Sequence, residues 1–362
     1  LVENSRFVGS EQEGLRVDEA GGTVQDNVFA ENGSAASVRY FRDYSGPIVT
    51  FANNAGSGGG TNGIKHHGHL HSDADWNVNE GLPYVVSKDL VVESEAALTV
   101  EPGAVVKFGM EDDYGDDTRL EVKGTLQAEG TAQDSIVFTS IRDDTYGGDT
   151  NGDEDSTSAA AGDWNQIRFA DGSDGSLTHA IVRYGGILWF DGGFGVGEEE
   201  RAVPMVDIQG ASPEIANSTI AYSRGEGMRA TSTDSTAVTP LVENSRFVGS
   251  EQEGLRIEEA GGTIQDNVFA ENGKAARVLN YGEPPTPTLR MNVIEENSAG
   301  VHISGSSVPD LGTNSEYGEN IFRRNDSYAV KNTSNETVQA VGNYWDATSA
   351  SAIDDKIYDD DE

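Results

Sequence analysis

The strongest candidate for chemistry is the acidic loop IRDDTYGGDTNGDEDS at 141–156. Its oxygen-bearing side chains alternate along the chain, and Gly152 between them permits a tight turn. Calcium takes about six to eight oxygen ligands, and D-x-N-x-D spacing is typical of calcium loops, although the Glu that closes an EF-hand is missing. We therefore predict a calcium site, with a solvated acidic loop as the alternative. The predicted ligands are Asp149, Asn151, Asp153 and Asp155, with Asp143 and Asp144 as additional ones.

Two further stretches are weaker candidates for metal binding. The acidic turn GMEDDYGDDT at 109–118 has no regular ligand spacing, so a solvated turn is the simpler interpretation. In HHGHLH at 66–71 the histidines alternate, and an extended strand would place them on one side, as a transition-metal site requires. Gly68 interrupts that strand, and an exposed strand without metal is the alternative. The candidate ligands are Asp112, Asp113, Asp116 and Asp117 in the first stretch, and His67, His69 and His71 in the second.

Asn-x-Ser/Thr motifs, the acceptors of N-glycosylation, recur in this asparagine-rich chain, and chance accounts for most of them. Asn217 and Asn325 fall in the repeat described below, where membership of an Asn ladder is the better interpretation. Asn332 and Asn335 are kept as weak glycosylation candidates.

No catalytic centre can be assigned from the motifs. Hydrolysis of glycans requires two carboxylates at a controlled separation, but among 62 Asp and Glu some pair meets any separation. The R-x-P-x-x-R pattern of lyases does not occur, and an acidic surface repels an anionic uronate. His179 and His302 lie in strand contexts as packed residues. The chain is therefore interpreted as non-enzymatic, with a polysaccharide lyase or glycoside hydrolase as the alternative.

These candidate residues are positioned by a repeat within a repeat. Residues 1–38 recur at 241–278 with five differences, which indicates duplication of a large unit. Within that unit an Asn, a large apolar residue and a short Gly/apolar strand recur at intervals of 23 to 28 residues. Short strands at this period, with no helical spacing, predict an all-β right-handed parallel β-helix with coils of about 22–28 residues. The Asn residues predicted to form an amide ladder along the stack are Asn217, Asn244, Asn267, Asn292, Asn320 and Asn343.

The strand pattern extends upstream of the ladder. AALTVEPGAVVKFG at 96–109 and LEVKGTLQAEG at 120–130 alternate apolar and polar residues between Gly and Asp turns. GSGGGTNG at 56–63 has the composition of a flexible connection. We therefore divide the chain into the end of a preceding repeat unit at 1–48, a Gly/His-rich connection at 49–76 and a complete unit at 77–362.

Composition limits the partners. The chain carries 24 Lys and Arg against 62 Asp and Glu, for a net charge of −38. This charge repels nucleic acid and anionic membranes and attracts divalent cations. There is no cysteine, so stability outside the cell has to come from stacking, hydrogen bonds or calcium. No apolar run approaches the length of a membrane span, and no membrane insertion is predicted.

The run LPYVV…LTVEPGAVVKF…GTLQAEGTAQDSIVFTS…GDWNQIRF…SLTHAIVRYGG resembles the pectin-lyase-like right-handed β-helix of large bacterial and archaeal surface proteins. NYWDATSASAIDDKIYDDDE at 343–362 is similar to the segment that closes such domains. The resemblance covers most of 77–362 and implies that architecture. It implies no active site, because these modules occur in proteins of many functions.

The sequence is thus interpreted as a calcium-stabilised, non-enzymatic repeat of an extracellular surface protein that forms filaments or adheres. The expected partners are copies of itself, head to tail or in a filament, because near-identical solenoid ends favour such contacts. Binding of a neutral surface glycan through aromatic side chains on one sheet is the intermediate alternative. The aromatic candidates are Tyr114, Tyr146, Trp189 and Phe194.

Overall fold

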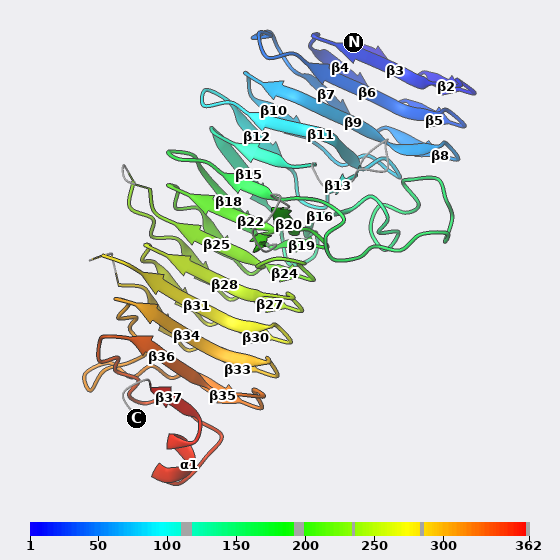
Figure 1. Ribbon diagram of the computed structural model, residues 1–362. Helices are drawn as coiled ribbons and strands as arrows, with labels where there is room; N and C mark the ends of the chain where they lie inside the picture. Colours follow the sequence, from blue (N-terminus) through cyan, green and yellow to red (C-terminus); the bar gives the residue numbers. More distant parts are fainter. Residues whose placement is uncertain (110–117, 192–198, 234–235, 283–285, 360–362) are drawn as a thin grey trace. The chain divides into compact units, whose positions relative to one another are not determined.

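The computed structural model describes residues 1–109, 118–191, 199–233, 236–282 and 286–359. They form two compact units, the first comprising residues 1–168 and 173–185 and the second residues 169–172 and 186–362. Each unit is a stack of short parallel strands (Figure 1). The predicted right-handed parallel β-helix is confirmed.

The first unit contains the strands from β1 to β19, of which β17 ends at its boundary. Their bounds are β1 (Val2–Glu3), β2 (Arg6–Val8), β3 (Glu13–Asp18), β4 (Gly22–Gln25), β5 (Val28–Ala30), β6 (Ser34–Tyr40), β7 (Val49–Ala52), β8 (Ala55–Ser57), β9 (Thr61–Leu70), β10 (Ala74–Trp76), β11 (Tyr84–Val92), β12 (Ala97–Val100), β13 (Val105–Phe108), β14 (Leu120–Val122), β15 (Thr125–Glu129), β16 (Ile136–Ser140), β17 (Ile167–Phe169), β18 (Asp174–Thr178) and β19 (Ala180–Arg183).

The second unit contains the remaining strands and one short helix. Their bounds are β20 (Ile187–Asp191), β21 (Glu199–Val203), β22 (Val206–Gln209), β23 (Glu214–Ala216), β24 (Thr219–Ala221), β25 (Met228–Thr231), β26 (Leu241–Glu243), β27 (Arg246–Val248), β28 (Glu253–Glu258), β29 (Thr263–Gln265), β30 (Val268–Ala270), β31 (Lys274–Asn280), β32 (Thr288–Arg290), β33 (Val293–Glu295), β34 (Ala299–Gly305), β35 (Ile321–Arg323), β36 (Val330–Ser334), α1 (Ala350–Asp354) and β37 (Ile357–Asp359).

Each coil places successive strands on different faces of the stack. In the first unit one face runs β1-β4-β7-β10-β12-β15-β18, a second begins β2-β5-β8, and a third begins β3-β6-β9-β11. In the second unit the faces run β23-β26-β29-β32, β24-β27-β30-β33-β35 and β22-β25-β28-β31-β34-β36-β37. Side chains of a strand alternate between core and solvent, so a residue's outward neighbours come from the adjacent coils.

Aromatic side chains stack on one another inside the coils. In the first unit the ring centroids of Phe7 and Phe29 lie 4.9 Å apart, and those of Phe108 and Trp164 lie 4.1 Å apart. In the second unit Phe247 and Phe269 repeat the first pair at the same 4.9 Å. Stacked rings bury a large apolar area in a narrow cross-section, which lets a thin coil form a core.

Amide ladders connect the same turn of successive coils in parts of both units. In the second unit Asn267 Nδ2 donates to Asn292 Oδ1 at 3.1 Å, Asn292 to Asn320 at 3.1 Å, and Asn320 to Asn343 at 2.9 Å. Asn27, Asn54 and Asn79 form the same contacts in the first unit, at 3.0 and 2.9 Å. A second ladder joins Asn272, Asn297 and Asn325 at 3.0 Å per step. Of these residues, only Asn325 is assigned a ladder role from the sequence.

Two predicted ladder residues, Asn217 and Asn244, are not ladder members. Both adopt left-handed backbone conformations, with φ of 53° and 51°, and each precedes the serine that occupies the ladder position. Ser218 N donates to Ser245 Oγ at 3.1 Å, and Ser245 N donates to Asn267 Oδ1 at 2.9 Å. Asn tolerates the left-handed conformation better than most residues, which explains its presence one position before the ladder.

Residues 49–76, predicted as a Gly/His-rich connection, contain β7 to β10 of the first unit's stack. The stretch 56–63, predicted to be flexible, lies in β8, in β9 and in the short turn between them, so that local prediction is corrected. The glycines there serve close packing between coils. A Cβ on Gly59 would lie 2.6 Å from Asn32 O, and one on Gly60 would lie 2.9 Å from Gly33 O. Glycine is required where backbones approach this closely. The boundaries between repeat units stay a prediction.

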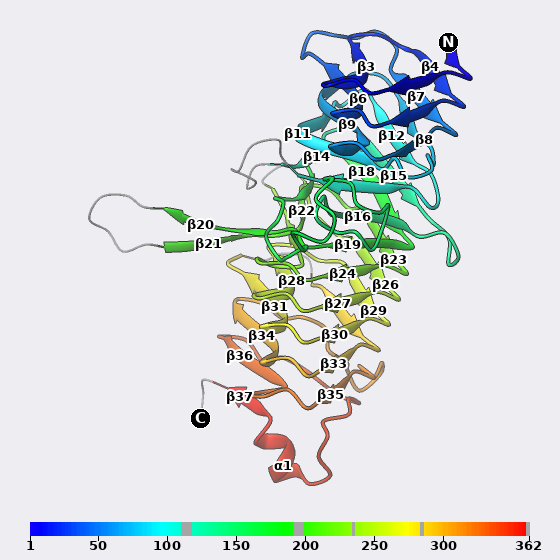
Figure 2. The same ribbon diagram turned by 90° about the vertical axis from the view of Figure 1, so that its right-hand side faces the viewer.

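Strands β20 and β21 depart from the coil pattern. They pair antiparallel and form a hairpin that extends outward from the coils of the second unit (Figure 2). Within the described ranges, no helix has the length and apolar character needed to cross a membrane.

Two candidate cation sites and a cationic sheet face

The predicted calcium loop leaves the first unit's stack after β16 and is anchored on its inner side by two residues. Lys107, a buried residue of β13, donates through Nζ to Asp143 O at 2.9 Å and to Gly148 O at 2.7 Å. Asn62, on β9, donates through its backbone N to Thr150 O at 2.8 Å. Burial lowers the pKa of Lys107 to about 8, although nearby carboxylates oppose the shift.

Three carboxylates converge within this loop. Asp144, Asp149 and Asp153 each offer an oxygen within 4.8 Å of the others. Asp149 also shapes the turn, because its Oδ1 accepts from Gly152 N at 2.8 Å and its Oδ2 accepts from Glu154 N at 3.1 Å. Burial, reinforced by the neighbouring carboxylates against the effect of Lys107, raises the pKa of Asp144. Mutual repulsion of this kind is relieved when a cation enters.

Three side-chain oxygens of the loop are shielded from solvent without a hydrogen-bond donor among the described residues. They are Oδ1 of Asp144, Oδ1 of Asn151 and Oδ1 of Asp153. Asn151 Nδ2 donates to Thr157 Oγ1 at 3.1 Å, whereas Asn151 Oδ1 accepts no hydrogen bond from the described residues. Shielded oxygens without donors are costly unless a cation or water satisfies them.

The remaining predicted calcium ligands lie elsewhere. Asp143 is buried and accepts from Arg183 Nε at 2.7 Å and from Thr139 at 2.5 Å. Burial raises its pKa, but these hydrogen bonds outweigh burial and the net pKa is lowered. Asp155 is exposed and does not join the three converging carboxylates. The weaker candidates Asp112, Asp113, Asp116 and Asp117 lie outside the described residues.

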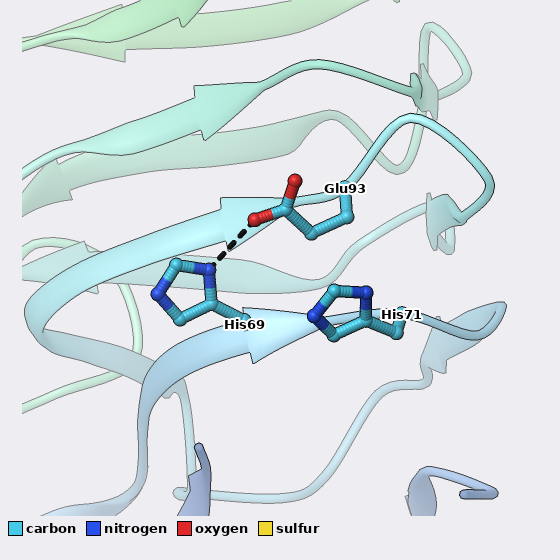
Figure 3. A group of neighbouring side chains, drawn as sticks. All are labelled: His69, His71 and Glu93. Atoms are coloured by element: carbon cyan, nitrogen blue, oxygen red, sulfur yellow. Dashed lines mark hydrogen bonds and ion pairs between the residues drawn. The ribbon is translucent and has the colours of Figure 1, made fainter. Parts of the chain in front are cut away.

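The histidine stretch provides a second group, but with a different membership from the predicted one. His69 and His71 lie together with Glu93, and one ligand atom from each falls within 4.8 Å of the others (Figure 3). His67 is separated from them by Gly68, which has a left-handed φ of 103°. A Cβ at that position would overlap Tyr40 O, so the close approach to the preceding coil requires glycine. The register between β9 and β11 shifts at the same place, between Val86 and Leu90.

Carboxylates of the next coil hold both imidazoles of this group. His69 Nδ1 lies 2.7 Å from Glu93 Oε1, and His71 Nδ1 lies 2.7 Å from Glu95 Oε1. The hydrogen bond with Glu95 raises the pKa of His71 and lowers that of Glu95. Burial raises the pKa of Glu93, but hydrogen bonds from His69 and Lys123 outweigh it, and the net pKa is lowered.

Sequence reasoning missed Glu93 and Glu95, although a signal was present. Each follows its histidine by 24 residues, which falls within the predicted coil length. Residues one coil apart become neighbours in a stack, so the coil length itself could have identified both carboxylates.

A cationic groove on the outer face of β3, β6, β9 and β11 was also missed. It has a volume of about 170 Å³, and its charged lining has four cations against two carboxylates. Asp18 pairs with two of these cations, at 2.9 Å with Arg16 and 3.3 Å with Arg39. The lining residues are Glu13, Arg16, Asp18, Ser37, Arg39, Lys65, His67, Ser87 and Lys88.

The second unit carries a row of basic side chains on its corresponding sheet face. Neighbouring strands place them in register, in the order Arg229, Arg256, Arg277, His302 and Lys331. Burial, with the neighbouring cations, lowers the pKa of His302 to about 4, so the charges at neutral pH come from the three arginines and the lysine. Two of the five differences between the repeated segments, Ser34/Lys274 and Ser37/Arg277, add cations to this face. Among the described residues Arg277 forms no ion pair, although the chain is rich in carboxylates. Ion pairs inside the protein therefore neutralise only part of the positive charge of this row.

The two glycosylation candidates differ in exposure. Asn332 is 7% exposed, and its amide nitrogen donates to Glu336 O at 3.1 Å. Asn335 is exposed just beyond the end of β36. Modification of Asn335 stays a prediction, whereas Asn332 would have to break its contact to react.

Comparison with known proteins reaches part of the second unit. Residues 194–351 match the family described as "Protein of unknown function (DUF1565)". The match covers less than half of the chain and concerns a family associated with β-helix proteins, in agreement with the stacked strands. A search of curated proteins finds no match to this sequence.

Proposed function

We propose that this chain is a calcium-stabilised, non-enzymatic β-helix repeat of an extracellular surface or filament-forming protein, of the pectin-lyase-like kind. The observation that carries the proposal is the convergence of Asp144, Asp149 and Asp153, with shielded oxygens that no described donor satisfies. Oxygen ligands of this kind suit calcium, which accepts irregular coordination and completes it with water.

Calcium has a defined structural role at this position. The loop spans the 26 residues between β16 and β17 and is an excursion from the regular coils. Lys107 and Asn62 hold the inner side of the loop through hydrogen bonds to backbone carbonyl oxygens. On the acidic side, the described side-chain partner of the Asp153 carboxylate is the Thr157 hydroxyl, which carries no charge. A bound ion would neutralise the acidic side and connect the two ends of the turn. The near-identical segments 1–38 and 241–278 support assembly of copies head to tail.

Calcium at one hundred times its dissociation constant is expected to raise the free energy of unfolding by roughly 2–3 kcal/mol relative to chelated protein. The measurement is thermal unfolding in calcium and in chelator, followed by negative-stain microscopy of both samples. We expect regular fibres with calcium that fray on chelation.

The matched variants lie in the same loop. Asp149→Ala combined with Asp153→Ala should abolish the calcium-dependent rise, whereas Asp155→Ala should retain it because Asp155 is outside the converging group. Identical melting curves for the wild type in calcium and chelator would contradict the calcium site. Separate particles in both conditions would contradict the filament role.

The cationic groove favours a second candidate function, the binding of an acidic glycan. The chain has a net charge of −38, but the groove of about 170 Å³ is lined by more cations than carboxylates, four against two. Of the aromatic candidates, Tyr146 packs under Arg183, at 4.6 Å from the guanidinium, while Tyr114, Phe194 and the side chain of Trp189 lie outside the described part of the chain. The charge pattern therefore supports this function better than the aromatic pattern.

Titration with a uronate oligosaccharide should give binding that weakens with salt, and Arg39→Ala combined with Lys65→Ala should reduce affinity at least tenfold. Exposed ionic contacts are screened within about 10 Å at 0.1 M salt. Arg119→Ala is the matched control, because Arg119 does not line the groove. Equal affinity for a neutral oligosaccharide would contradict charge recognition, and shortened products would contradict the non-enzymatic assignment.

A further inference from the structure

His69, His71 and Glu93 form a group with the composition of a transition-metal site. The two histidines come from β9 and the residue after it, two positions apart, so their rings lie side by side with centroids 6.2 Å apart. Glu93 follows β11, the next strand of the stack, and its backbone N donates to Leu70 O at 2.9 Å. The register between the coils therefore brings the carboxylate over the imidazoles (Figure 3).

Two imidazoles and one carboxylate are a ligand set that zinc accepts, with water in the remaining position. Calcium prefers oxygen ligands throughout, so this group and the acidic loop differ in the metal they select. The chain contains no cysteine, so thiolates cannot supply a competing zinc site.

The surrounding residues orient the ligands as metal sites require. Metal-bound histidines usually donate their other ring N–H to a carboxylate or a carbonyl, which fixes the ring and its tautomer. Glu95 accepts this hydrogen bond from His71 Nδ1 at 2.7 Å and leaves Nε2 as the ligand atom. Lys123 Nζ holds Glu93 at 3.2 Å from the other side.

The metal-free geometry requires only a small adjustment. His69 Nδ1 and Glu93 Oε1 lie 2.7 Å apart, joined through a proton. Two ligands of a tetrahedral zinc lie about 3.3 Å apart, given bonds of roughly 2.0–2.1 Å, so the carboxylate has to withdraw by about half an ångström. His71 Nε2 has to leave the Arg42 carbonyl oxygen, now 2.6 Å away. The side chains of His69, His71 and Glu93 are 22%, 19% and 14% exposed, which leaves a path for the ion.

We propose that His69, His71 and Glu93 bind one zinc ion, which clips β9 to the turn that follows β11. Glu95 is a positioning residue that orients the His71 ring. The site is independent of the calcium loop, because the two groups share no residue.

Isothermal titration with zinc chloride at pH 7.5, in the presence of calcium, should give one zinc per chain. His69→Ala and His71→Ala should each lose at least 100-fold in affinity. Glu95→Gln, which keeps the size of the side chain but weakens the hydrogen bond, should lose about 10- to 100-fold. His67→Ala is the matched control and should bind as the wild type does. Cobalt(II) should give an absorption spectrum of a four-coordinate site in the wild type and the control.

Absence of heat and of a cobalt spectrum in the wild type would overturn the site, as would equal loss of affinity in His67→Ala. Circular dichroism and urea unfolding without metal should show that each variant is folded. If an alanine variant does not fold, the loss of zinc affinity in Glu95→Gln tests the site instead. The double variant at Asp149 and Asp153 should still bind zinc, so failure of the calcium proposal is distinguishable from failure of this one.

Discussion

Replacing Asn292 by leucine is expected to lower the free energy of unfolding by about 3–6 kcal/mol. The side chain of Asn292 accepts from Asn267 N and Nδ2, both at 3.1 Å, and donates to Ile264 O at 2.9 Å and Asn320 Oδ1 at 3.1 Å. Leucine removes all four contacts and leaves buried donors and acceptors unsatisfied, at roughly 1–3 kcal/mol each. Urea unfolding at neutral pH measures the loss.

The control for this prediction uses an asparagine that the sequence also places in the ladder. Asn244→Gly should change stability by less than about 0.5 kcal/mol, because glycine adopts the left-handed φ of 51° without strain. Ser245→Ala should cost about 1 kcal/mol or more, since its Oγ accepts from Ser218 N. A large loss in Asn244→Gly with none in Ser245→Ala would contradict the ladder observed here.

Acid is expected to destabilise the first unit through His66. This side chain is 1% exposed and packs among Phe51, Trp76 and Tyr84, with ring centroids 6.3, 5.1 and 5.6 Å away. Neither ring nitrogen has a hydrogen-bond partner within the described residues. Burial, with a smaller contribution from His67, lowers the pKa of His66 from 6.5 to about 3.

The lowered pKa of His66 makes the protein less stable in acid. Between pH 6.5 and about 3 the unfolded chain binds a proton on His66 that the folded chain does not. Stability therefore falls as the pH falls through that window, by about 1.4 kcal/mol per pH unit. At pH 5 the contribution of His66 should be a loss of roughly 2 kcal/mol relative to pH 7.5.

His66→Leu isolates this contribution. The variant should be more stable than the wild type at pH 7.5 by about 1–3 kcal/mol, because unpartnered ring nitrogens are removed from the core. Its advantage should grow by roughly 2 kcal/mol between pH 7.5 and pH 5, as measured by urea unfolding at each pH. His67→Leu is the control for the neighbouring ring. Parallel pH dependence in the wild type and His66→Leu would rule out a buried neutral His66.

The sequence alone determined the coil architecture, because successive coils repeat the same short pattern of residues. Asn, an apolar residue and a short strand recur at intervals close to the ladder steps, and the stack extends those steps through Asn267, Asn292, Asn320 and Asn343. The acidic loop was also visible, since Asp149 and Asp153 lie close in sequence and meet through a local turn.

Only the tertiary structure decided which polar side chains meet across coils. Coil lengths vary, and a loop of 26 residues interrupts one of them, so register cannot be counted reliably along the chain. Asp143 pairs with Arg183, 40 positions away, and is withdrawn from the calcium group. Glu93, rather than His67, completes the histidine group: Gly68, with its left-handed φ, separates His67 from His69, and the register between β9 and β11 shifts at the same place. In a stacked coil the backbone conformation at single turns sets these neighbours, and residue type restricts that conformation without fixing it.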